Sequence, residues 1–175
     1  GPPAANTAFA DALQKIIAEL DAQNPRGWIL DLRENTGGNM WPMLAGIGPL
    51  LGEGECGKFL THGVTSIWWY RDGISGLDRA PITKISGEPY RLRPPTHPVA
   101  VLTSGKTASS GEAITVAFKG RAFTRSFGGA TRGQSTANRG FPLADKEMIF
   151  LTTGTYVDRT GKVYGKAIDP DEPIS

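Results

Sequence analysis

The stretch "HPVAVLTSGKTASSGEAITVAFKG", residues 97–120, decides how this chain folds. Its short apolar run predicts a buried strand. The segment from Ser109 to Gly120 predicts a helix that ends at a glycine. Between the two lies a turn of small residues, several of which carry hydroxyl groups. We therefore expect a strand–turn–helix unit with Ser109 at the start of the helix.

The segments on either side alternate between helix and strand patterns. A helix is predicted for residues 6–23, where apolar residues recur at spacings of three and four, and Asn6 or Thr7 can cap its start. The other expected elements are a buried strand "GWILDLR" (27–33), an apolar helix (40–52), hairpins within 57–98, a strand (122–127), and strand-like runs on both sides of "DRTGK" (158–162). This order predicts an α/β fold with a central, largely parallel sheet flanked by helices and a β-rich hairpin region.

Two polar loops follow predicted strands: "ENTGGN" (34–39) and "SGKTASSG" (104–111). Ligands of parallel sheets bind outside the carboxyl ends of the strands. We therefore expect both loops at the same edge of the sheet, where they would form a site.

Ser109 has two interpretations. With Glu112 it forms a capping-box pattern, which stabilises a helix start without any further function. Alternatively, a serine beside the free N–H groups of a helix start is well placed as a nucleophile. In that case the N–H of Ser110 and a backbone N–H of Gly37 or Gly38 would hold the oxyanion.

Four segments together resemble one family. "WILDLRENTGG" (28–38), "VLTSGKTASSGEA" (101–113), "FGGATRGQST" (127–136) and "LTTGTYVDRTGKVYGKAIDPD" (151–171) are similar, in the same order, to segments of the tail-specific, or C-terminal-processing, serine peptidases. Relatives of that family include tricorn protease and the interphotoreceptor retinoid-binding protein modules. The resemblance covers most of the chain and implies a crotonase-like core and peptide-bond hydrolysis through an acyl-enzyme on Ser109.

The resemblance is incomplete at the general base. Many members carry a lysine at the position of Gln134 and a glutamine at that of Asn138. An amide such as Gln134 is not a base, although it can orient a water or a substrate amide. The resemblance places Gln134 in the catalytic site and Asn138 and Thr131 in the substrate site. Tricorn-like members use a glutamate where this chain has approximately Tyr164.

Three explanations for the missing base stay open. Tricorn-like members take a histidine from a segment before the core, and we favour this explanation because, by the resemblance, this chain is expected to start after that segment. A residue of the chain, either Lys106, His62 or His97, could instead substitute. Finally, the protein could have lost hydrolysis and bind peptides or an apolar ligand only.

The composition and charge of the chain bear on nucleic-acid binding, metal binding and membrane insertion. The net charge is +2 among 175 residues and no basic run is present, which disfavours nucleic-acid binding. Cys56 is the single cysteine, and no Cys/His spacing suggests a metal. No apolar run is long enough for a membrane span. We expect residues 1–175 to form a single core domain that lacks upstream segments of the full protein, with no cofactor and with a peptide or protein substrate. The oligomeric state is left open, and the resemblance favours a periplasmic or exported location.

Overall fold

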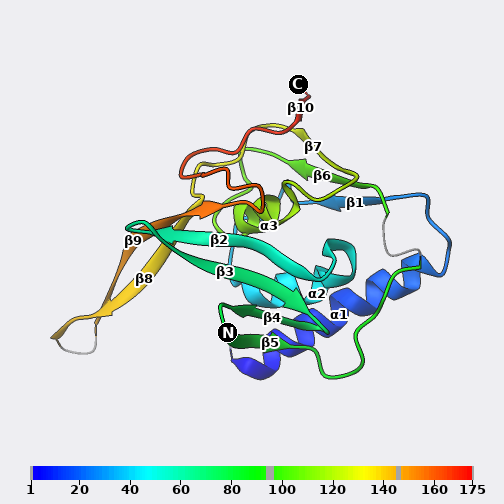
Figure 1. The fold of residues 1–175 in the computed structure, drawn as a ribbon, viewed down its shortest axis with the longest axis horizontal. Coiled ribbons are helices and arrows are strands. Elements are labelled where there is room, and N and C mark those ends of the chain that lie inside the picture. Colours follow the sequence, from blue (N-terminus) through cyan, green and yellow to red (C-terminus); the bar gives the residue numbers. More distant parts are fainter. Residues whose placement is uncertain (1, 94–96, 145–146, 175) are drawn as a thin grey trace.

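A parallel sheet forms one side of the molecule in the computed structural model, which describes residues 2–93, 97–144 and 147–174 (Figure 1). Its strand order is β1-β6-β7-β10, and every pairing is parallel. The bounds are β1 (Trp28–Asp31), β6 (Val99–Thr103), β7 (Thr124–Gly128) and β10 (Glu172–Pro173). The parallel sheet predicted from the alternating pattern is therefore confirmed.

An antiparallel sheet forms the other side, with the strand order β5-β4-β3-β2-β9-β8. Its strands are β2 (Gly54–Thr61), β3 (Val64–Arg71), β4 (Ile74–Leu77), β5 (Ala80–Lys84), β8 (Thr136–Pro142) and β9 (Met148–Val157). Asp72 and Gly73 form the turn between β3 and β4, both with positive φ, within the region where hairpins are predicted. The strands β8 and β9 project from the rest of the sheet as a long hairpin (Figure 1).

Helix α3 (Ser110–Phe118) lies between the two sheets, and all nine of its residues are buried. It packs beside α2 (Met40–Leu51), and α1 (Pro3–Asp21) covers α2 from the outside (Figure 1). Side chains from both sheets and from all three of these helices contribute to one hydrophobic cluster, which includes Trp68, Tyr156 and Val101. The start of α3 is therefore held in place by packed elements of both sheets.

Helix α1 differs from the expectation in its start and in its buried face. It begins at Pro3, so neither Asn6 nor Thr7 caps it, and the Thr7 hydroxyl instead donates to Lys84 O at 3.0 Å. The predicted apolar face is only partly buried, because Phe9, Ile16 and Leu20 are about half exposed. The buried positions are Ala10, Gln14, Ile17 and Asp21. Both polar side chains are hydrogen-bonded: Gln14 bonds Ala45 O and Tyr90 N, and Asp21 accepts from the Tyr90 hydroxyl.

Within the described residues, no helix has both the length and the apolar character that crossing a membrane requires.

The thiol of Cys56 is expected to be unreactive in the folded protein. Cys56 is fully buried in β2, and this burial raises the pKa of the thiol to about 12. Because only the thiolate reacts, a thiol reagent such as DTNB should give no absorbance change at pH 8 without denaturant. Unfolding in urea should release one reactive thiol per chain. Rapid, stoichiometric reaction of the native protein would contradict this expectation.

Candidate active site

Ser109 lies between the end of β6 and the first residue of α3, in a strained backbone conformation. Its φ is 52° and its ψ is −115°, outside the regions that L-residues usually occupy. Such a residue costs about 1–3 kcal/mol and is typical of functional sites. Its side chain is half-buried and contributes to the wall of a cavity. Ser109 is therefore presented at a surface, rather than packed in the interior as a purely structural cap would be.

The loop after β1 contacts the Ser109 turn directly, because β1 and β6 are neighbouring parallel strands. Ala108 N donates to Asn35 O at 3.0 Å, and Gly37 N donates to Asn35 Oδ1 at 3.1 Å. A Cβ on Gly37 would lie 3.0 Å from Ser109 Cβ and 3.2 Å from Ala108 O, and Gly37 has a φ of +115°. Glycine is therefore required at residue 37, both for its conformation and for space. The two loops lie at the same edge of the sheet, as the sequence predicts.

Two backbone N–H groups next to Ser109 have no acceptor among the described residues. They belong to Gly38 and to Ser110. The two residues are neighbours, because Ser110 Oγ donates to Gly38 O at 2.7 Å, and both line the same cavity as Ser109. The N–H of Gly37 is occupied by Asn35, so Gly38 is the glycine that retains a free donor. Two free donors from separate loops beside a hydroxyl have the composition of an oxyanion site.

The carboxylate of Glu112 fixes the Ser109 turn to the loop at residues 131–134. One oxygen, Oε2, accepts from Ser109 N and from Gln134 N, each at 2.8 Å. The other, Oε1, accepts from Thr131 Oγ1 at 2.6 Å and from Gly133 N at 2.9 Å. Glu112 itself is fully buried. The predicted bond from the Ser109 N–H to Glu112 is thus present, but the same carboxylate also organises a second loop, which the capping-box pattern does not indicate.

The remaining predicted site residues are only partly brought together. Gln134 N is close to Ser109 N through Glu112, but the exposed Gln134 side chain does not line the Ser109 cavity. The Thr131 hydroxyl is buried and used twice, because it donates to Glu112 and accepts from Ile168 N at 2.8 Å. Thr131 therefore supports Glu112 and does not reach the cavity. Asn138 does line the cavity, with its Oδ1 accepting from Thr152 Oγ1.

The cavity at Ser109 has a volume of about 530 Å³ and extends between α3 and the antiparallel sheet. Its apolar part is formed by Met40, Phe59, Leu77 and Tyr156, and threonine, serine and asparagine side chains form much of the remainder. This volume and mixed lining suit a segment of peptide with an apolar side chain.

None of the three residues named from the sequence as candidate bases is available to Ser109. Each is either paired with another side chain or lies away from the cavity. Lys106 Nζ pairs with Glu34, at 2.8 and 3.0 Å from its two carboxylate oxygens, and both side chains are exposed. His97 is buried just before β6, and Ser109 follows the other end of that strand. His62 lies in the exposed turn between β2 and β3. Neither histidine lines the Ser109 cavity.

Two further polar groups have structural partners. Arg33 binds Asp31 through two bonds of 2.9 and 2.7 Å, and these bonds lower the pKa of the Asp31 carboxyl to about 2. Asp31 and Arg33 therefore form an ion pair at the end of β1. Tyr164 is buried and donates to Asp158 Oδ2 at 2.8 Å, and its burial raises the pKa of the phenol. In the part of the chain that the structure describes, no three His, Cys, Asp or Glu side chains gather as metal ligands.

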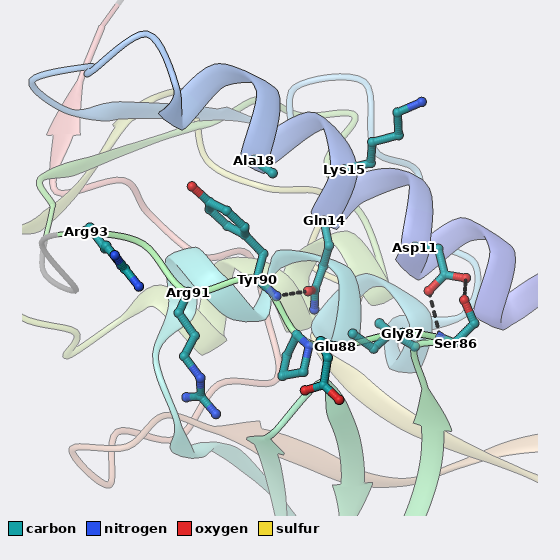
Figure 2. A pocket seen from close by; sticks show the side chains of 12 residues that line it. Asp11, Gln14, Lys15, Ala18, Ser86, Gly87, Glu88, Tyr90, Arg91 and Arg93 are labelled. Carbon is teal, nitrogen blue, oxygen red and sulfur yellow. Dashed lines mark hydrogen bonds between the residues drawn. The ribbon is translucent and has the colours of Figure 1, made fainter.

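A larger cavity, of about 860 Å³, lies between α1 and residues 85–93, and it shares no lining residue with the Ser109 cavity (Figure 2). Its polar groups hold the segment to the helix. Asp11 accepts from Ser86 N at 2.9 Å and from Ser86 Oγ at 2.6 Å, and Gln14 Oε1 accepts from Tyr90 N at 2.8 Å (Figure 2). We therefore interpret this cavity as the space left between α1 and the segment that packs against it, and we assign it no ligand or reaction.

Comparisons with known proteins identify a family for this chain. The model of peptidase family S41 matches residues 4–174. The chain is 30% identical over 163 residues to the nisin-resistance protein of Lactococcus lactis subsp. lactis, covering 93% of this chain and 50% of that protein. A lipoprotein from Streptococcus agalactiae has a similar structure, with a TM-score of 0.78 and 32% identity, over 100% of this chain and 58% of that one. The chain thus spans about half the length of these relatives.

A more distant structure supports the fold alone. The photosystem II D1 C-terminal processing protease aligns with a TM-score of 0.73 at 21% identity, over 97% of this chain and 40% of that one. The fold therefore extends well beyond the range of clear sequence similarity.

Proposed function

Since the chain belongs to peptidase family S41, we propose that it hydrolyses peptide bonds with Ser109 as the nucleophile. One observation carries this proposal: the strained, half-buried Ser109 lines a cavity beside two free N–H groups from separate loops. A serine that served only to cap α3 would require neither the cavity nor the second loop.

In the proposed reaction, Ser109 Oγ attacks the carbonyl carbon of the scissile peptide bond while a base takes the hydroxyl proton. The oxyanion of the tetrahedral intermediate accepts hydrogen bonds from Gly38 N and Ser110 N. Collapse of the intermediate breaks the C–N bond, and the protonated base gives its proton to the leaving amine. Water then attacks the acyl ester in the same way, releasing the new carboxylate and restoring Ser109.

We further propose that the base comes from a residue outside these 175 residues. Support for this comes from Lys106, which is engaged with Glu34, and from His62 and His97, which lie away from the cavity. Gln134 does not supply this base, since its amide cannot accept the proton and its side chain does not line the cavity.

A fluorophosphonate probe tests this assignment, because it reacts with activated serines. We expect the complete protein encoded by the gene to be labelled at Ser109, with the site mapped by mass spectrometry. Ser109→Ala should abolish the label, and the control Arg132→Gln, which changes an exposed side chain outside the cavity, should keep it. The 175-residue chain alone should label far more slowly.

The second candidate function is a peptide-binding module without catalysis, and the amide at Gln134 is the observation that favours it. The same experiment separates the two, because the absence of label in the complete protein would leave binding as the function. Rapid labelling of the 175-residue chain alone would instead show that the base lies within it. We also propose an exported or cell-envelope location, supported by the lipoprotein relative, which fractionation of expressing cells would test.

A further inference from the structure

The Ser109 cavity carries one charged side chain. Of the residues that line it, all described by the structure, only Arg139 has a formal charge. Arg139 lies on β8, the edge strand of the antiparallel sheet, and it is exposed. An unopposed cation in an otherwise neutral cavity biases which ligands enter it.

Arg139 lies where the hairpin leads from the core into the Ser109 cavity. Ala137 pairs with Gly154, and Arg139 pairs with Leu151, with an irregularity in the register between Ala137 and Asn138. Ala137 packs against the hydrophobic cluster that contains Tyr156, and both Ala137 and Arg139 line the cavity. Because alternation of faces does not carry across the irregularity, the cavity lining is the observation that places Arg139 at this site.

The Phe141 ring orients the guanidinium of Arg139, but no carboxylate of the described residues neutralises its charge. It lies over the ring of Phe141, with 5.7 Å from Cζ to the ring centroid. No carboxylate of the described residues forms an ion pair with it, in contrast to Arg33, Arg91 and Arg125. Stacking on an aromatic ring leaves the N–H edges of an arginine free, and these edges match the geometry of a carboxylate.

We propose that Arg139 determines substrate specificity by binding a carboxylate of the substrate, while the apolar wall of the cavity accepts a neighbouring side chain. This proposal rests on the proposed function of Ser109. The carboxylate belongs either to the C-terminus of the substrate or to an aspartate or glutamate side chain, since both present the same two oxygens to the guanidinium.

The test compares matched fluorophosphonate probes on the complete protein. Each pair has an arm of the same length that ends in a carboxylate or in a carboxamide, and three arm lengths are used. For at least one length, the carboxylate probe should label Ser109 about three- to tenfold faster, as expected for an exposed charge-assisted contact. Arg139→Gln should remove this preference, Arg139→Lys should keep part of it, and Arg132→Gln, which changes an exposed arginine outside the cavity, should leave it intact.

The outcomes separate this inference from the proposed function. If neither probe labels Ser109, the proposed nucleophile is wrong. If both label equally at every arm length, or if the preference survives in Arg139→Gln, the role of Arg139 is wrong although Ser109 is the nucleophile. Four competitor peptides, with a free or amidated C-terminus and with Asp or Asn, then identify the source of the carboxylate. Competition that is insensitive to both changes would overturn carboxylate recognition.

Discussion

Glu112→Ala is expected to lower the free energy of unfolding by at least about 3 kcal/mol and to abolish labelling of Ser109. The substitution leaves four buried or half-buried donors without their acceptor, namely the N–H groups of Ser109, Gly133 and Gln134 and the hydroxyl of Thr131. Each unsatisfied buried donor costs about 1–3 kcal/mol. Urea unfolding followed by circular dichroism measures the loss of stability, and the fluorophosphonate probe measures the loss of reactivity.

Glu112→Gln is the matched control, because it keeps the size of the side chain and one carbonyl oxygen. Its NH₂ group would face either two backbone N–H groups or one N–H and the Thr131 hydroxyl, so at least one donor loses its acceptor. We expect an intermediate loss of about 1–3 kcal/mol. A Glu112→Ala protein as stable as the original would mean that water replaces the carboxylate, and that the two loops do not depend on it.

Gly37→Ala should slow labelling of Ser109 by about 10²-fold or more, the size expected when an oxyanion site is disturbed. The added methyl group would lie 3.0 Å from Ser109 Cβ and 3.5 Å from Ser109 Oγ, and the φ of +115° is unfavourable for alanine. Either the loop or the hydroxyl must then shift. The rate of labelling, measured over a range of probe concentrations, separates this effect from a loss of folded protein.

Gly38→Ala controls for backbone strain, because Gly38 has nearly the same φ, +119°, but a Cβ there would meet only Met43 Cε, at 3.7 Å. The alanine also retains the N–H that we assign to the oxyanion site. We expect a clearly smaller effect on labelling than for Gly37→Ala. Equal effects would show that strain in the loop matters, and that crowding of Ser109 does not.

The sequence was sufficient to predict the parallel sheet and the meeting of the two loops. Strands β1 and β6 are short apolar runs, and each is followed by small or polar residues, so their pairing brings Gly37 and Ser109 to one edge. The double role of Glu112 was not predictable, because it depends on the loop at residues 131–134, which is distant in sequence.

The other differences between prediction and structure have a common physical cause. The hydropathy of a residue does not show which hydrogen-bond or strand-pairing partners it will have. Gln14 is buried in α1 because its side chain forms hydrogen bonds with Ala45 O and Tyr90 N. Asp21 is buried because its carboxylate accepts a hydrogen bond from Tyr90 Oη. The strand β8 was not predicted because "TANRGFP" is polar, contains glycine and proline, and pairs only with β9. Patterns of apolar residues identify elements that pack against the core, and β8 is largely exposed.

The contrast between α3 and the β8–β9 hairpin has a consequence for how such proteins diversify. Every residue of α3 is enclosed, so mutation there is constrained by packing, whereas the hairpin reaches into solvent and tolerates change. Under the two proposals made above, bond cleavage would depend on the enclosed helix, and the choice of substrate on the exposed hairpin. Substitutions in the hairpin would then change the preferred substrate without altering the residues around Ser109.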